Sequence, residues 1–288
     1  MKEITVLSGK GGTGKTSIMA AISCMADRAV FCDADVDASD LHLIFHPEII
    51  EEHVFLGAWI PALDENTCNN CGICIDHCRF DAIHQFNGNK PVINTFQCEG
   101  CRLCERVCPE KAISSARSIA NRWFVSSTRF GTMVHARMGP GEENSGKLVT
   151  EVRKKARQLA LDDDVPYIIT DGPPGIGCPV IASLTGTRSV LLITEPTLSG
   201  MQDVSRLVQL VNDFDIPMYG VINKYDINPE ISGKIENLFH EKSIPLIGKI
   251  PYTNEMIDAM VAGKTINEYQ PGSPLVKTIQ NIWEVLKK

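Results

Sequence analysis

The sequence predicts an α/β protein in which a mostly parallel sheet is flanked by helices and a small α+β module is inserted. Short apolar runs alternate with segments of helical period through residues 1–60 and 115–288. These runs end in loop-forming residues, as strands of an open sheet do. Residues 61–114 differ in character, because they contain eight of the 11 cysteines. We therefore expect one large domain, interrupted by residues 61–114.

Six short apolar runs predict the strands of the parallel sheet. Ligands of open α/β sheets bind at the carboxyl ends of the strands, so the loops that follow these runs are candidate functional segments. The predicted strands are Ile4–Leu7, Ala29–Asp33, Tyr167–Asp171, Ser189–Thr194, Met218–Asn223 and Pro245–Ile250.

The last predicted element is an amphipathic helix over residues 275–286. Its apolar face consists of Leu275, Ile279, Ile282, Trp283 and Leu286. Packing on the sheet is the favoured interpretation, since few cations flank this face. A membrane-surface helix is the alternative.

The composition excludes several classes of protein. Apolar residues make up 43% of the chain and charged residues 22%, which suits a packed core. No apolar stretch reaches the roughly 20 residues of a membrane span, and the N-terminus lacks the pattern of a signal peptide. We therefore expect a cytoplasmic protein. The net charge of -7 argues against a nucleic-acid partner, which would need a basic surface.

One segment departs from this acidic balance. Between Lys111 and Arg157 there are ten basic residues and three acidic ones, Glu142, Glu143 and Glu151. A solvated helix face explains this as ordinary surface charge, and a docking surface for an acidic partner is the alternative.

The cysteine-rich segment contains an internal duplication. The spacing Cys-x2-Cys-x2-Cys-x3-Cys occurs twice, displaced by 30 residues, and the second copy ends in Cys108-Pro109. Between the copies, Ile83–Phe86 and Val92–Thr95 flank Asn87-Gly88-Asn89, which predicts a β-hairpin. The duplicated cysteines are Cys68, Cys71, Cys74 and Cys78 in the first copy and Cys98, Cys101, Cys104 and Cys108 in the second.

This segment resembles the two-cluster bacterial ferredoxins over about 46 residues. The resemblance implies two 4Fe-4S clusters, each held by three cysteines of one copy and the fourth of the other. One cluster would use Cys68, Cys71, Cys74 and Cys108, and the other Cys98, Cys101, Cys104 and Cys78. Zinc is the alternative, although structural zinc sites have no use for a third cysteine at this short spacing.

A second motif follows the first predicted strand and begins a predicted helix. Its glycines allow backbone N–H groups to surround phosphates, Lys15 reaches the β and γ oxygens, and Thr16 supplies an oxygen to Mg²⁺. This pattern predicts a P-loop NTPase domain that binds ATP or ADP with Mg²⁺. The candidate phosphate-binding residues are Gly9, Lys10, Gly11, Gly12, Thr13, Gly14, Lys15, Thr16 and Ser17.

Lys10 makes the motif similar to the deviant Walker A motif of the MinD/ParA group of ATPases. That group includes the nitrogenase iron protein and the Mrp/Nbp-type cluster carriers. The resemblance implies that Lys10 crosses an ATP-bound homodimer to the partner's phosphates. A solvent-exposed loop lysine is the alternative.

Further loops resemble the switch regions of the same group. By this resemblance Asp35 or Asp37, after the second strand, would orient the attacking water, with Asp35 preferred. Asp171, after the third, would support Mg²⁺, and Gly175 would sense the γ-phosphate. Some of these acids are also suited to capping a helix.

Two later loops match adenine-contacting positions of the group, and ordinary turn chemistry is their alternative. They contain Asn223-Lys224 and Pro251-Tyr252. Cys178 lies seven residues after Asp171, where the nitrogenase iron protein has a cluster ligand. We weigh a metal or redox role against a small, partly buried residue at a helix start. Cys24 and Cys32 are interpreted as core.

The leading functional hypothesis is an ATPase whose nucleotide-switched dimer controls electron transfer from two 4Fe-4S clusters to an unidentified redox partner. A metallocofactor maturation factor or cluster carrier, acting on a client protein, is the second. A spatial positioning ATPase like MinD or ParA is the third, with the least support from the charge and the terminal helix.

Overall fold

The computed structural model describes residues 1–142 and 145–288, and it divides them into two compact units. The larger unit comprises Met1–His53, Trp123–Arg137 and Ser145–Lys288. The smaller unit comprises Val54–Arg122 and the described part of Met138–Asn144. The predicted insert, residues 61–114, lies within the smaller unit.

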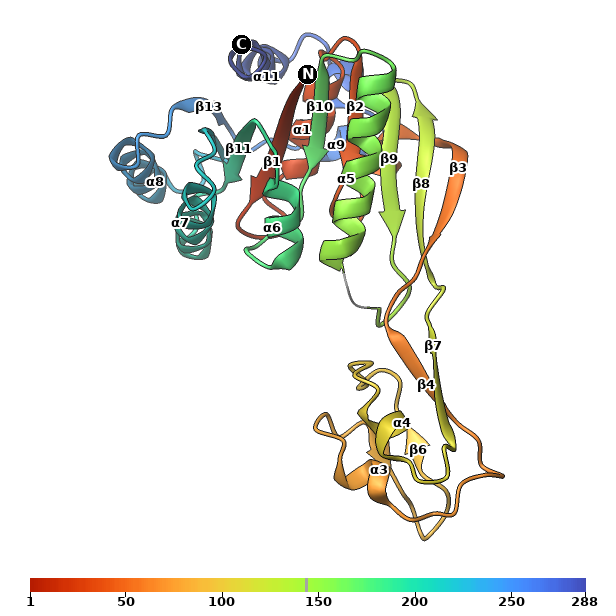
Figure 1. Ribbon diagram of the computed structural model, residues 1–288. Coiled ribbons are helices and arrows are strands. Elements are labelled where there is room, and N and C mark those ends of the chain that lie inside the picture. Colours follow the sequence, from red (N-terminus) through yellow and green to blue (C-terminus); the bar gives the residue numbers. More distant parts are fainter. Residues whose placement is uncertain (143–144) are drawn as a thin grey trace. The chain divides into compact units, whose positions relative to one another are not determined.

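The larger unit is built on a mostly parallel sheet, as the sequence predicted (Figure 1). Its order among the described residues is β13-β12-β11-β1-β10-β2-β9-β8-β3. Strand β1 pairs in parallel with β10 on one side and β11 on the other, so it lies in the interior of the sheet. The loop that follows β1 therefore lies among the carboxyl ends of the central strands. The six strands expected from the sequence are β1 (Lys2–Ser8), β2 (Ala29–Asp33), β10 (Tyr167–Asp171), β11 (Ser189–Thr194), β12 (Met218–Asn223) and β13 (Leu246–Ile250).

Three further strands extend the sheet beyond β2 and were not predicted. β9 (Gly131–Arg137) pairs in parallel with β2, and β8 (Asn121–Thr128) and β3 (Glu48–Phe55) follow it. The sequence Glu48-Ile-Ile-Glu-Glu-His-Val-Phe55 contains too many charges to stand out as an apolar run. Its place at the sheet edge, where one side needs no partner strand, explains that composition.

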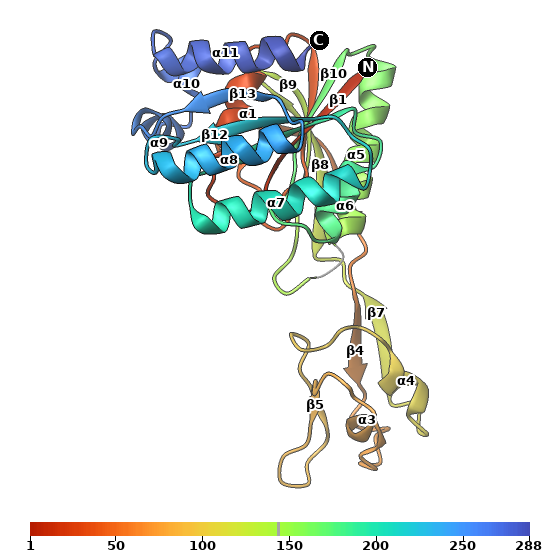
Figure 2. The same ribbon diagram turned by 90° about the vertical axis from the view of Figure 1, so that its left-hand side faces the viewer.

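Helices cover both faces of the sheet (Figure 2). One core joins the sheet to α1 (Lys15–Ser23), α2 (Leu41–Phe45), α10 (Ile266–Tyr269) and α11 (Pro274–Leu286). The other joins it to α6 (Cys178–Leu184), α7 (Leu198–Asn212) and α8 (Pro229–Glu241). The remaining long helix, α5 (Ser145–Asp162), contacts β2, β9 and β10, and α9 (Glu255–Val261) lies beside α10.

The C-terminal helix α11 packs as the favoured interpretation required. Leu275, Ile279, Ile282, Trp283 and Leu286 are all buried, and they belong to the core that contains α1. Within the described part of the chain, no helix has the length and apolarity needed to cross a membrane.

Most of the basic segment's ionic contacts lie on the larger unit itself. Lys155 binds Glu51 at 2.9 Å, and Arg129 binds Glu268 at 2.7 Å. Arg153 and Arg157 both bind Glu3. Four of the ten cations are therefore paired within the larger unit, and of these only Arg153 is buried. Glu143, one of the acids counted in this segment, lies outside the described residues.

The smaller unit contains two short antiparallel ladders. β4 (Trp59–Leu63) pairs with β7 (Ile113–Arg117), and these two strands are called the ribbon below. β5 (Ile83–His84) pairs with β6 (Val92–Ile93), at the position of the predicted hairpin. Two helices, α3 (Ile73–Asp76) and α4 (Leu103–Val107), occupy equivalent places in the two cysteine runs. Because the ribbon strands flank the cysteine runs, the unit extends beyond the expected boundaries at 61 and 114.

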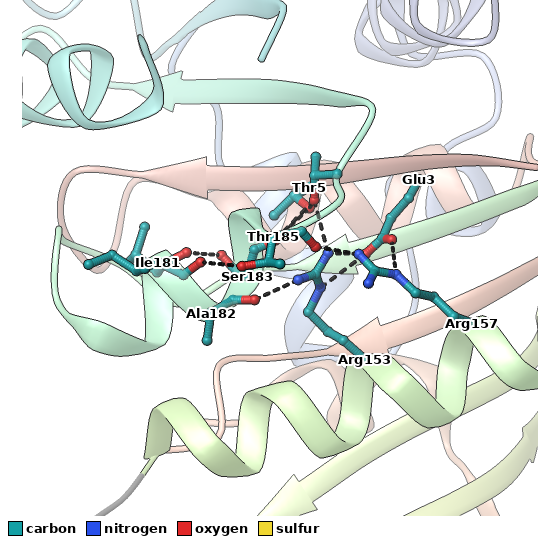
Figure 3. Close-up of polar contacts among 10 residues, drawn as sticks. Glu3, Thr5, Arg153, Arg157, Ile181, Ala182, Ser183 and Thr185 are labelled. Atoms are coloured by element: carbon teal, nitrogen blue, oxygen red, sulfur yellow. Dashed lines mark hydrogen bonds and ion pairs between the residues drawn. The ribbon is translucent and has the colours of Figure 1, made fainter. Parts of the chain in front are cut away.

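A buried ionic network fixes β1, the strand that leads into the P-loop, to α5 and α6 (Figure 3). Arg153 is 3% exposed and donates from Nε to Glu3 Oε1 at 3.0 Å, and from a terminal nitrogen to Ala182 O at 2.5 Å. Arg157 Nε donates to Glu3 Oε2 at 2.6 Å. Since every charge in the network has a partner, its burial is tolerated.

Replacing Arg153 should destabilise the protein strongly. We expect Arg153→Met to lower the free energy of unfolding by about 3 kcal/mol, because Glu3 stays buried with one of its two partners lost. Lys154→Met is the matched control, since Lys154 is exposed on the same helix and should cost less than about 0.5 kcal/mol. Denaturant unfolding measures both, and equal losses would show that the network adds nothing.

Candidate functional site

The P-loop connects β1 to α1 at the centre of the sheet edge. Gly12 and Gly14 have φ values of 79° and 85°, a left-handed conformation that glycine adopts without strain. A Cβ on Gly14 would lie 2.4 Å from Asn223 Nδ2, so the close approach of β12 also requires glycine here. Asn223 Nδ2 in turn donates to Thr13 O at 2.8 Å, which holds the loop against β12.

A cavity of about 420 Å³ lies over this loop. Its polar lining includes the P-loop, Asp35 and Asp40. Its apolar lining includes the side chains of Met256, Ile257 and Met260. Of the residues expected to bind nucleotide, it is lined by Gly11, Gly12, Thr13, Gly14, Lys15, Thr16, Ser17, Asn223, Lys224, Pro251 and Tyr252.

Lys15 lines the cavity and is buried among carboxylates. Its Nζ lies 2.6 Å from Asp171 Oδ1 and 3.6 Å from Asp35 Oδ2. Burial alone would lower the pKa of Lys15, but these carboxylates outweigh it and raise that pKa. Lys15 is therefore a fixed positive charge at the bottom of the site.

The carboxylates are more numerous than one lysine can neutralise. Burial raises the pKa of Asp33 to about 7, and the nearby charge of Asp171 adds to the effect. Burial also raises the pKa of Asp35 to about 6, against the opposing pull of Lys15. Thr16 Oγ1 donates to Asp171 Oδ2 at 2.8 Å. This oxygen-rich corner has the hard ligands that Mg²⁺ prefers.

An unsatisfied group also points to a missing ligand. Thr13 is 2% exposed, and its hydroxyl oxygen has no hydrogen-bond partner. A buried polar atom without a partner is costly, and a phosphate oxygen would satisfy it. Together with the P-loop amides and Lys15, this fits the phosphates of a nucleotide.

Lys10 does not line the cavity, and it is held within its own chain. Its Nζ lies 2.7 Å from Glu195 Oε1 and donates to Thr197 Oγ1 at 3.1 Å. The same carboxylate binds Lys224 Nζ at 2.9 Å. Sequence reasoning missed Glu195, although Glu195-Pro196 follows β11 at the ligand-binding edge of the sheet.

The other predicted residues are distributed as follows. Gly9 packs against α7, where a Cβ would come within 2.5 Å of Asp203. Gly175 has a φ of 88° and donates its N–H to Ser8 O at 3.0 Å. Asp37 is exposed, whereas Asp35 Oδ2 lies 3.6 Å from Lys15 Nζ and Asp35 lines the cavity, so Asp35 is the candidate that the structure brings to the site. Asn223 lines the cavity, but its amide is already engaged by the P-loop.

Two small cavities in the smaller unit are each bordered by four cysteines. The first thiol site contains Cys68, Cys71, Cys74 and Cys108. The second thiol site contains Cys78, Cys98, Cys101 and Cys104. In each, three cysteines come from one run and the fourth from the other, which is the crossed grouping that the ferredoxin resemblance implied.

The backbone repeats the 30-residue duplication. Left-handed residues recur in pairs, such as Asn70 with Gly100 and Asp81 with Lys111. The N–H groups of Asn70 and Gly100 both donate to the sulfur two residues earlier, at 3.4 Å. Amides that donate to cysteine sulfur favour the thiolate, the form that binds metals.

No metal ion can be assigned from ligand geometry alone. Among residues 1–142 and 145–288, no group of three His, Cys, Asp or Glu side chains is arranged to hold a single ion. The three cysteines outside the runs are separate. Cys178 is exposed at the start of α6, Cys32 is buried in β2, and Cys24 is only partly buried.

Comparisons with known proteins agree with the fold and the P-loop. In solved structures, the septum site-determining protein MinD of Pyrococcus horikoshii, complexed with Mg-ADP, superposes with a TM-score of 0.59 at 16% identity, covering 100% of this chain and 96% of that one. The MinD protein of Thermotoga maritima is 21% identical over 97% of this chain and 85% of its own length.

Two further relatives complete the comparison. An uncharacterised protein of Methanocaldococcus jannaschii is 30% identical over 99% of this chain and 96% of its own length. The iron-sulfur cluster carrier protein of Pyrococcus furiosus is 24% identical over 49% of this chain and 52% of its own. The family model of the CobQ/CobB/MinD/ParA nucleotide binding domain matches residues 4–266. The chain therefore belongs to this family of nucleotide-binding ATPases.

Proposed function

We propose that this ATPase carries two 4Fe-4S clusters and that its nucleotide state controls electron transfer from them to a redox partner. The observation that carries the proposal is the pair of cysteine-bordered cavities. Eight thiols separated by up to 40 residues are gathered into two quartets by the fold. Zinc would need no third cysteine at the short spacing, whereas a cubane takes four thiolates.

The chain's residues fit this cofactor in a specific way. Cys68, Cys71, Cys74 and Cys108 would hold one cluster, and Cys78, Cys98, Cys101 and Cys104 the other. Each cluster would supply a one-electron redox centre. The backbone amides that donate to the sulfurs would stabilise the thiolates and tune the potential, as hydrogen bonds to cluster sulfurs do.

The nucleotide half of the proposal rests on Lys10. In the structure Glu195 holds Lys10 within its own chain. On ATP binding, we propose, Lys10 exchanges this carboxylate for the phosphates bound by a second copy. Asp35 would then orient the attacking water and Asp171 would support Mg²⁺. The closed homodimer is the state that presents the clusters to the partner.

A second candidate function is donation of a cluster to a client protein. Two relatives are iron-sulfur cluster carrier proteins, the one from Pyrococcus furiosus and one from Rickettsia felis that is 30% identical over 34% of this chain. Cys71 and Cys101 are also exposed, one at each thiol site. The crossed grouping favours retention, because releasing one cluster removes a bond between the two runs. A MinD-like positioning role remains a third candidate, on the strength of the MinD relatives alone.

Iron content is the first test. Protein purified without oxygen should contain about eight irons and eight sulfides per chain, because eight thiolates support two cubanes. Cys104→Ala should lower the iron content by about half, whereas Cys32→Ala, a buried cysteine outside the runs, should leave it unchanged. Stoichiometric zinc with little iron after anaerobic reconstitution would refute the cluster assignment.

The two P-loop lysines should behave differently. Lys15→Ala should weaken ATP binding about tenfold or more, because Lys15 lies at the bottom of the chain's own cavity. Lys10→Ala should keep most of the affinity but lose ATP-dependent dimerisation and at least about tenfold of the hydrolysis rate. Binding, sedimentation and phosphate release measure these effects. Wild-type hydrolysis by Lys10→Ala would remove the proposed role of Lys10.

Electron transfer and cluster donation can be separated by following the iron. The loaded protein is chemically reduced, freed of excess reductant, and incubated with an iron-free acceptor ferredoxin and, separately, with an oxidised redox dye. We expect dye reduction with all iron retained on this chain, because both cysteine runs hold each cluster. Quantitative transfer of iron to the acceptor, accelerated by ATP, would instead establish the carrier function.

A further inference from the structure

One face of the ribbon borders both thiol sites, but with different side chains. Leu63 pairs with Ile113, and this rung borders the first thiol site. Two residues along the ladder, Pro61 pairs with Ser115, and this rung borders the second thiol site. Alternate residues of a strand point to the same face, so both rungs lie on one face of β4 and β7, which run side by side (Figures 1 and 2). The rung at the first site is apolar, whereas the rung at the second carries a hydroxyl.

The hydroxyl of Ser115 is a polar group without a partner. Its oxygen is shielded from solvent, and among the described residues it has no hydrogen-bond partner. A buried polar atom in this state is unfavourable, and it indicates a partner that the protein's own atoms do not supply. Because Ser115 borders the second thiol site, the group bound at that site is in place to accept its hydrogen bond. The sulfurs of a 4Fe-4S cluster accept hydrogen bonds of this kind.

Glu105 is a competing acceptor for this hydroxyl. Arg102 and, after it, Ser115 lower the pKa of Glu105 to about 2. Arg102 already donates to both oxygens of that carboxylate, from Nε at 2.9 Å and from a terminal nitrogen at 3.0 Å. The approach of Ser115 to Glu105 does not have the geometry of a hydrogen bond. The hydroxyl is therefore free to turn toward the second thiol site.

The first thiol site lacks this hydroxyl, although its backbone donors match those of the second. In the part of the chain that the structure describes, each site has two backbone N–H groups that donate to cysteine sulfur, at 3.3 or 3.4 Å. The 30-residue duplication makes Gln85 the counterpart of Ser115, but Gln85 does not border the first thiol site. Its amide nitrogen donates instead to Asn70 Oδ1 and to Asn89 O, both at 2.8 Å. The side-chain donor is therefore a difference between the two sites.

A carboxylate adds to this difference. Glu110 borders the first thiol site, and its counterpart in the duplication is Phe80, which borders the second. Asn69 Nδ2 donates to Glu110 Oε1 at 3.0 Å. An added electron makes a site more negative, so a nearby carboxylate disfavours reduction and a hydrogen-bond donor favours it. Because Glu110 is exposed, water screens its charge, and Ser115 carries most of the difference.

We propose that Ser115 donates a hydrogen bond to a sulfur at the second thiol site, and that this site therefore takes up the first electron. This inference rests on the proposed function and deepens it by setting the order in which the two sites are reduced. Ser115 acts on the sulfur and is not a ligand of iron. Reduction of the site adds one electron, supplied by a reductant such as dithionite, and makes or breaks no covalent bond. The first thiol site, which lacks the hydroxyl, is reduced second.

The test is a potentiometric titration of the full-length protein, purified without oxygen and free of nucleotide, followed by EPR. Cys71→Ser and Cys101→Ser assign the signals, since each alters one site. In the wild type, the second thiol site should be reduced at the higher potential. Ser115→Ala should lower the reduction equilibrium of that site about tenfold, or about 59 mV for one electron. The first thiol site should stay within about twofold of its wild-type equilibrium.

Further variants separate the hydroxyl from the packing of the strand. Ser115→Thr keeps the hydroxyl and should keep the potential of the second thiol site near its wild-type value. Ser115→Val has nearly the shape of that variant without the hydroxyl, and it should reproduce the loss seen with Ser115→Ala. Ser114→Ala is the matched control, because Ser114 is the exposed neighbour on the opposite face of β7 and should leave both potentials unchanged. Iron content should stay near the wild-type value in all four variants.

Two results would overturn the inference and leave the proposed function standing. Unchanged potentials in iron-loaded Ser115→Ala would show that the hydroxyl does not reach the sulfur and that Glu105 is its acceptor. Equal losses at both sites, or a first thiol site that is reduced more easily in the wild type, would show that Ser115 does not set the order. Wild-type protein that binds no iron would overturn the inference together with the proposed function.

Discussion

The buried pair of Lys15 and Asp171 is the interaction around which the ATPase unit is organised. Lys15 is 6% exposed and Asp171 1%, so neither charge could remain without the other. The pair joins the first residue of α1 to the last residue of β10, and Asp35, after β2, lies beside it. Three elements distant in sequence are thereby held at the one edge of the sheet where their loops can surround phosphates.

The cluster of carboxylates around Lys15 suits the site to bind a cation and a polyanion together. Burial raises the pKa of Asp33 and of Asp35, and the adjacent carboxylates contribute in both cases. A divalent cation would relieve that repulsion, and phosphates would balance the cation and Lys15. Lys10, the other lysine of the P-loop, is paired with Glu195 and does not contribute to this charge balance.

Much of this arrangement could be predicted from the sequence. The six apolar runs gave the central strands because buried parallel strands are continuous in hydrophobicity. The resemblance to two-cluster ferredoxins implied the two quartets, and in the structure Cys108 borders the cavity of the first run and Cys78 that of the second. The P-loop was recognisable from its glycine spacing, and at Gly14 the positive φ and the close approach of Asn223 leave no room for a side chain.

The remainder could not be predicted, for identifiable physical reasons. β3 is an edge strand with charges on its solvent side, so it lacks an apolar run. Glu195 acts through contacts to Lys10 and Lys224, which are 185 and 29 residues away, and no local pattern encodes them. The ribbon was hidden because Trp59–Leu63 and Ile113–Arg117 look like linkers until they pair.

The central claim is that nucleotide and cluster states are coupled. Calorimetric titration of the Mg-ATP analogue into oxidised and into reduced protein tests it most directly, because linkage requires reciprocal effects. Coupling predicts affinities that differ about tenfold, equal to the shift in the reduction equilibrium. Identical affinities in iron-loaded protein would contradict it.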